Sequence, residues 1–218
     1  MTGGPRFVEL ATEPRTFVFD INVWLNVADL LGTNAVQSDR ERLDRAVAQR
    51  PIPDREQPQM DDYRVWRMAA SGLFTPSLTA IVYISRSMIK TLYTKLTQPE
   101  SGPTAETAGL GWTRDEARDF ISDAVMSFAR LPEHDGFQEP ISAVRGGTHQ
   151  PALDHEDGMV LACALQVGAH FLVTSDSDFN AVRGDRRWKN TLAIVTPGML
   201  TALQRRYGGG AGPSRRYD

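Results

Sequence analysis

Short runs of β-branched and aromatic residues alternate with longer segments of helical periodicity, and this alternation restricts the fold more than any other feature. Strand-like runs occupy residues 16–19, 79–84, 169–174 and 192–195. Apolar residues recur at helical spacing over residues 24–31, 88–96, 117–128, 156–167 and 200–203. Strands that alternate with helices predict an α/β domain with a central, mainly parallel sheet flanked by helices.

Polar and turn-forming stretches set the expected domain limits. We expect residues 1–15 to be a lead-in, 16–206 to form one domain, and the glycine-rich end, 207–218, to be a flexible tail. Residues 37–63 are charged and polar and contain three prolines, which predicts a mobile insertion with a short exposed helix at 40–49. The segment at 131–153 is loop-like and contains a candidate strand at 141–144.

The overall charge and the cysteine content exclude several classes of protein. The 218 residues carry a net charge of −3, so a nucleic-acid partner needs a local basic patch rather than an overall positive field. The only lysines are Lys90, Lys95 and Lys189. A single cysteine, Cys163, excludes an internal disulfide, and no run approaches the ~20 apolar residues of a membrane span. Because the start also lacks the plan of a signal peptide, we expect a cytoplasmic protein with no membrane partner.

Aspartates follow two of the predicted strands directly. Asp20 ends the first strand, Asp176 and Asp178 follow the strand at 169–174, and Asp157 begins the helix before it. Ligands of parallel sheets collect outside the carboxyl ends of the strands, so these side chains can converge there. Carboxylates in one pocket repel each other unless a cation neutralises them, and oxygen ligands suit Mg²⁺ or Mn²⁺. The pattern predicts an acidic metal pocket and metal-assisted hydrolysis of phosphodiester bonds.

Each aspartate also has a purely structural interpretation. Asp154 and Asp157 suit the N-cap and first turn of a helix, and Asp176 and Asp178 suit an Asx turn. Asp20 needs partners under either interpretation, because a carboxylate at the end of a buried strand is costly when unpaired. Their joint placement favours the metal site.

Four segments in the same order resemble the PIN-domain nucleases, a family that includes the VapC-like bacterial toxins. The resemblance covers roughly residues 16–203 and implies a PIN-like fold. The segments are Val18-Phe19-Asp20-Ile21-Asn22, like the D-x-N entry; Asp154 to Ala162, an acidic helix start; Val173 to Phe179, like T-x-D-x-D/N-F; and Ile194 to Leu200, a strand-Pro-helix ending.

The resemblance implies an Mg²⁺- or Mn²⁺-dependent endoribonuclease, a hydrolase that cleaves single-stranded RNA. It also suggests a toxin–antitoxin role with an antitoxin-like protein partner and a homodimer. Carried over by position, the catalytic and metal-binding residues are Asp20, Asp157, Asp176 and the auxiliary ligand Asp178, oriented by Asn22 and Ser175.

One acidic residue of the family pattern is missing here. The helix after the second strand usually carries a glutamate, whereas alignment of residues 85–92 with it places Thr91 at that position. No Asp or Glu occurs between Asp62 and Glu100. Two outcomes stay open: the four aspartates hold an ion, with Thr91 bound through water, or a weakened domain acts as an RNA-binding or protein-interaction module.

A basic stretch with a tryptophan, Trp188, follows the second acidic segment. Basic groups beside an aromatic ring suit contacts with phosphates and stacking of a base, while a solvated loop around a half-buried tryptophan is the alternative. The residues expected to contact substrate are Arg183, Arg186, Arg187 and Lys189.

Overall fold

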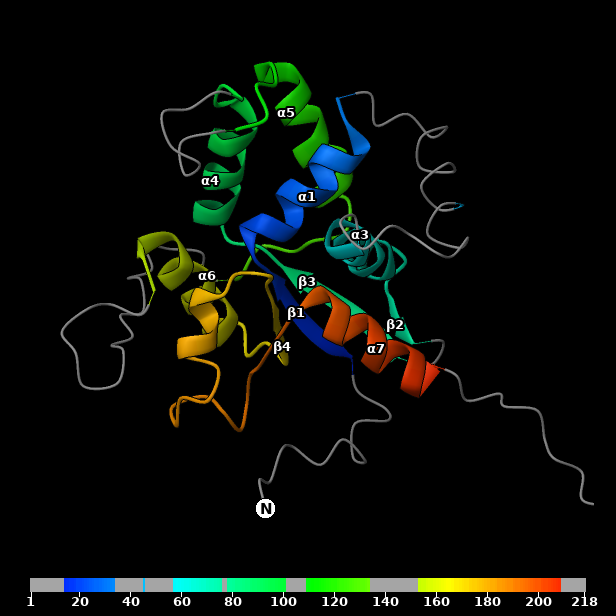
Figure 1. Cartoon of the computed structure of the whole chain (residues 1–218), viewed down its shortest axis with the longest axis vertical. Helices are drawn as coiled ribbons and strands as arrows, with labels where there is room; N and C mark the ends of the chain where they lie inside the picture. The colour runs from blue at the N-terminus through cyan, green and yellow to red at the C-terminus, as the bar shows by residue number, and fades with distance from the viewer. Residues whose placement is uncertain are drawn as a thin grey trace, which may run out of the picture.

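The centre of the computed structural model is a five-stranded sheet with the strand order β2-β3-β1-β4-β5 (Figure 1). The structure describes residues 14–33, 45, 57–75, 78–100, 109–133 and 153–208. The strands are β1 (Arg15–Phe19), β2 (Leu73–Thr75), β3 (Leu78–Tyr83), β4 (Phe171–Val173) and β5 (Ala193–Val195). All pairs are parallel except β2 with β3 at one edge, which confirms the predicted α/β class and mainly parallel sheet.

Helices cover this sheet on two sides. Helix α6 packs against β1, β4 and α4, whereas α3 and α7 pack against each other and against β2. Figure 1 shows the sheet between α6 and the α3–α7 pair, with α1, α4 and α5 gathered at one end. The helices are α1 (Ile21–Leu31), α3 (Gln57–Ala70), α4 (Arg86–Thr97), α5 (Arg114–Phe120), the π-helical η4 (Ile121–Val125), α6 (His155–Gln166), the 3₁₀ turn η5 (Asp178–Ala181) and α7 (Pro197–Gly208). Among the described segments, none of the helices combines the length and apolar character needed to span a bilayer.

The inner strands are buried because helices cover both of their faces. Phe17, Val18 and Phe19 of β1 are fully buried, as is Leu172 of β4. The rings of Phe17 and Phe171 stack across the two strands with their centroids 5.2 Å apart. Parallel strands in such a setting appear in a sequence as continuous apolar runs, which is why both strands were predictable.

Helix α3 corrects the expected polar insertion. Residues 57–63 are helical, and Tyr63 and Trp66 are buried with their rings 5.6 Å apart. The indole Nε1 of Trp66 donates a hydrogen bond of 2.8 Å to the carbonyl of Ala124. A proline in the first turn, here Pro58, leaves a helix intact because the N–H groups of that turn have no partner within the helix.

Several expected features lie outside the described residues. They are residues 1–13 of the lead-in expected at 1–15, residues 37–56 of the insertion expected at 37–63 apart from Arg45, the candidate strand at 141–144, and residues 209–218 of the tail expected at 207–218. The expected domain limits shift, because Arg15 already belongs to β1 and α7 extends to Gly208.

Candidate metal centre

The pairing of β1 with β4 brings two distant acidic segments together. Phe19 is in register with Val173, and the next backbone N–H, that of Asp20, donates to the Val173 carbonyl at 2.9 Å. The Thr174 hydroxyl donates to Asp20 Oδ2 at 2.7 Å and accepts from the N–H of Asp176 at 2.9 Å. Thr174 therefore ties the carboxylate that ends β1 to the segment that follows β4.

Three carboxylates form a cluster beside this link, which we call the acidic triad: Asp157, Asp176 and Asp178. One oxygen from each lies within 4.8 Å of the other two. Asp157 occupies the first turn of α6, where its N–H donates to the N-cap side chain of Asp154 at 2.8 Å. Asp176 Oδ1 accepts from the N–H of Asp178 at 2.8 Å. The N-cap and the Asx turn expected from the sequence are both present, and both are compatible with the cluster.

Negative charge and burial raise the proton affinity of Asp157. Its pKa rises from an ordinary 3.8 to about 8. Burial contributes most, and the charges of the neighbouring carboxylates, Asp20, Asp154, Asp176 and Asp178, raise the pKa further. All of these effects favour the protonated form of Asp157.

Asp20 lies beside the triad and is coupled to it. It is 2% exposed, and burial raises its pKa to about 6 against the opposing effect of hydrogen bonds from Thr174 and the Ile21 N–H. The charges of Asp176 and Glu156 raise that pKa as well. Asp20 is not among the three residues whose oxygens cluster within 4.8 Å, and both of its oxygens accept hydrogen bonds. Asp20, itself a predicted ligand, thus lies outside this cluster, and its role as a ligand stays a prediction.

The donor set of the triad fits a hard divalent cation. It offers carboxylate oxygens alone, which is the ligand type that Mg²⁺ and Mn²⁺ prefer. A cation there would relieve the repulsion that raises the pKa of Asp157.

The residues expected to orient the ligands are distributed differently from the prediction. Asn22 is exposed in the first turn of α1, and Ser175 is exposed after Thr174. Thr174, which the sequence analysis missed, makes the contacts expected of Ser175. A hydroxyl two residues before Asp176 is a known pattern of side-chain to backbone hydrogen bonding, and it would have revealed Thr174. Thr91 lines a pocket between α4 and α6.

A further carboxylate, Asp62 of α3, is buried close enough to influence the site. Its Oδ2 accepts a hydrogen bond of 2.6 Å from Asn26 on α1, and its Oδ1 has no hydrogen-bond partner within the described part of the chain. Burial raises its pKa to about 7, the Asn26 bond opposes this, and the charges of Asp61 and Asp20 add to it. We missed Asp62 because we assigned it to the polar insertion.

The basic loop between β4 and β5 only partly matches its prediction. Trp188 is 2% exposed and its indole N–H donates to the Val182 carbonyl at 3.1 Å. Because the ring is buried, the prediction that a base stacks on it is wrong. Arg187 is paired with Asp185 at 2.7 Å and lies 4.4 Å from the centroid of the Trp188 ring. Of the other expected substrate contacts, Arg183 is half-buried and Arg186 and Lys189 are exposed.

No family model, no curated protein and no solved structure matches this chain.

The Thr174 link can be tested by removing its hydroxyl. We expect Thr174→Val to lower the free energy of unfolding by about 1–3 kcal/mol, because buried Asp20 Oδ2 and the Asp176 N–H lose their partner. Urea denaturation measures the loss, and Thr174→Ser, which keeps the hydroxyl, serves as the control. Thr174→Ser measures the cost of losing the methyl group separately, and a Thr174→Val variant as stable as the wild type would show that the hydroxyl bonds do not stabilise the fold.

Proposed function

We propose that this chain is a PIN-like nuclease domain that cleaves single-stranded RNA with the help of Mg²⁺ or Mn²⁺. The acidic triad at the carboxyl edge of a parallel sheet is the observation that carries the proposal. The raised pKa of Asp157 supports it, since strongly perturbed carboxylates gather at functional sites. The resemblance of the segments around Asp20, Asp157 and Asp176 to PIN nucleases supplies the reaction and the substrate class.

Each residue of the site has a separate task in this proposal. Asp157, Asp176 and Asp178 would hold the cation. When bound, the cation supplies a water of lowered pKa and polarises a phosphoryl oxygen. Asp20 adds negative charge beside the triad, and Thr174 fixes the position of Asp20 relative to Asp176. The loop cations Arg186 and Lys189 are free to approach a polyanion because they are exposed.

Cleavage of a labelled single-stranded RNA in the presence of Mn²⁺ tests the function. We expect Asp176→Asn to lower the cleavage rate by at least about 100-fold, the upper end of what the loss of an outer-shell partner costs at metal sites. Asp119→Asn is the matched control, because it removes one negative charge at an exposed position of α5. Equal product from wild type and Asp176→Asn would point to a contaminant or to another site.

A non-catalytic RNA-binding or protein-interaction module is the second candidate. It is favoured by one observation: α4 presents Thr91, and no carboxylate, to the pocket beside the triad. Such a module predicts that neither Mg²⁺ nor Mn²⁺ changes the thermal stability of the chain, whereas a metal centre predicts a rise.

A further inference from the structure

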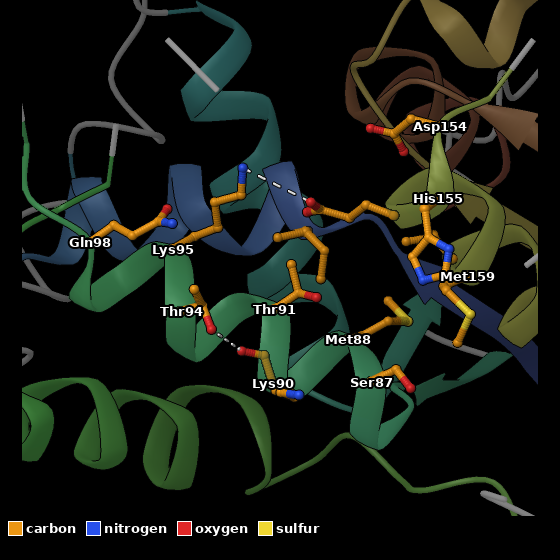
Figure 2. Close-up of a pocket in the computed structure, with 13 residues that line it drawn as sticks. Ser87, Met88, Lys90, Thr91, Thr94, Lys95, Gln98, Asp154, His155 and Met159 are labelled. Atoms are coloured by element: carbon orange, nitrogen blue, oxygen red, sulfur yellow. Dashed lines mark hydrogen bonds and ion pairs between the residues drawn. The ribbon is translucent and has the colours of Figure 1, made fainter. Parts of the chain in front are cut away.

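A pocket of about 700 Å³ lies between α4 and α6 (Figure 2). Its lining includes Ile21, which follows Asp20, and Glu156, which precedes Asp157. Figure 2 shows the α4 side chains on one side and those of α6, such as His155, on the other. The pocket therefore adjoins the site at which we propose that phosphodiester bonds are cleaved.

The α4 wall of this pocket is cationic. Lys90 and Lys95, two of the three lysines in the chain, line it together with the hydroxyl-bearing side chains of Ser87, Thr91 and Thr94. The helix carries no acidic residue from Arg86 to Thr97. Ammonium groups and the hydroxyls of Ser87 and Thr91 can donate hydrogen bonds to anionic oxygens, whereas the Thr94 hydroxyl already donates to the Lys90 carbonyl at 2.9 Å. The wall is therefore chemically complementary to phosphate.

One ion pair crosses the pocket and joins its two walls. Lys95 Nζ lies 3.9 Å from Glu156 Oε2, and both side chains are partly exposed. This separation is longer than a hydrogen bond, and a partly exposed pair of this kind contributes little to stability. An incoming anion can therefore take the place of Glu156 beside Lys95 at small cost.

We propose that this pocket is a phosphate subsite for the RNA strand beside the bond that is cleaved, with Lys90 and Lys95 as its ligands. The inference rests on the proposed function, because a strand held at the triad must continue into the adjoining space. Glu156 acts in this scheme as an internal anion that the strand displaces from Lys95. Thr91 stands where PIN nucleases usually carry an acidic residue, and in this proposal it lines the pocket that binds the substrate.

Binding in the absence of cleavage tests the subsite. All proteins carry Asp176→Asn and are kept in EDTA, and a fluorescein-labelled oligouridylate is followed by anisotropy over a range of NaCl concentrations. We expect Lys90→Gln with Lys95→Gln to weaken binding roughly tenfold. The slope of log K against log salt should become flatter by about 1.4, because each contact with a single-stranded phosphate contributes about 0.7.

Two further variants make the result specific to this pocket. Arg205→Gln with Arg206→Gln removes two exposed positive charges near the end of α7, away from α4 in Figure 1, and should leave affinity and slope almost unchanged. Glu156→Gln removes the internal competitor and should tighten binding several-fold. This opposite sign would not follow from a general loss of structure.

The inference is overturned if the lysine variant keeps the affinity and the salt slope of its parent. It is also overturned if a polyglutamate peptide competes as well as unlabelled RNA does, since the pocket would then suit an acidic protein. The cleavage assay is separate from this one. Failure to cleave alongside lysine-dependent binding would remove the proposed nuclease, whereas cleavage alongside lysine-independent binding would remove the subsite alone.

Discussion

In EDTA at pH 8, Asp157→Asn should be more stable than the wild-type protein. Folding raises the pKa of Asp157 from 3.8 to about 8, so the folded state binds its proton more tightly than the unfolded state does. The contribution of Asp157 to the stability of the wild type is therefore greatest below about pH 4 and falls as the pH rises towards 8. Asparagine avoids this penalty. Asp176 beside Asp157 is half-buried, so water screens part of the repulsion between the two carboxylates. We therefore expect Asp157→Asn to raise the free energy of unfolding by about 2 kcal/mol.

Manganese should reverse this order of stability. A cation at 100 times its dissociation constant stabilises the folded state by about 2.7 kcal/mol, and Asp157→Asn would lose most of this gain. Calorimetric melting with EDTA and then with Mn²⁺ measures both effects, and Asp119→Asn should behave like the wild type in each. If Mn²⁺ leaves the melting temperature of the wild type unchanged, the acidic triad is not a metal centre.

Asp62→Asn should flatten the dependence of stability on pH. Burial holds the pKa of Asp62 at about 7 in the folded chain against an ordinary 3.8, so ionisation of Asp62 costs stability between about pH 4 and 7. Asparagine keeps an oxygen for the Asn26 amide and has no charge to bury. By pH 8 the variant should be more stable than the wild type by about 3 kcal/mol, and at pH 4 the two should be nearly equal.

Urea denaturation at a series of pH values in EDTA measures this difference. The other carboxylates whose pKa is raised, Asp20, Glu156 and Asp157, titrate in both proteins, so the difference between the two curves reports Asp62 together with its coupling to Asp20. Parallel curves for Asp62→Asn and the wild type would show that Asp62 titrates normally in the folded chain.

Elements with strong local signals were predictable from the sequence. Residues 17–19 of β1 and all of β4 form continuous apolar runs because both faces of these strands are covered. The capping box of α5, in which Thr113 and Glu116 bond reciprocally, is a purely local signal. By contrast, β2 has three residues at the edge of the sheet, with Leu73 half-exposed, and leaves no periodic pattern. The charged residues and Pro58 at the start of α3 gave that segment the composition of a loop, and its buried face is formed only by packing against other elements.

The candidate site was predictable to the extent that parallel topology alone determines it. Strand ends in such a sheet share an edge, and that rule anticipated Asp176 and Asp178 meeting Asp157. The rule does not say which carboxylate oxygens accept hydrogen bonds within the protein, so the hydrogen bond from Thr174 to Asp20 was not predicted. The pairing of Lys95 with Glu156 depends on how α4 packs against α6, which neither helix specifies alone.

The register of β1 against β4 has a consequence for how this site can change over time. Alternate residues of a strand face opposite sides of the sheet, so a slip of one position would turn Asp20 away from Thr174 and at the same time move the side chains of β1 to the opposite helix layer. The packing of the sheet centre and the placement of the acidic residues therefore depend on the same register. A lineage that repacks the centre of this sheet can keep the contact between Asp20 and Thr174 only if it also keeps that alignment.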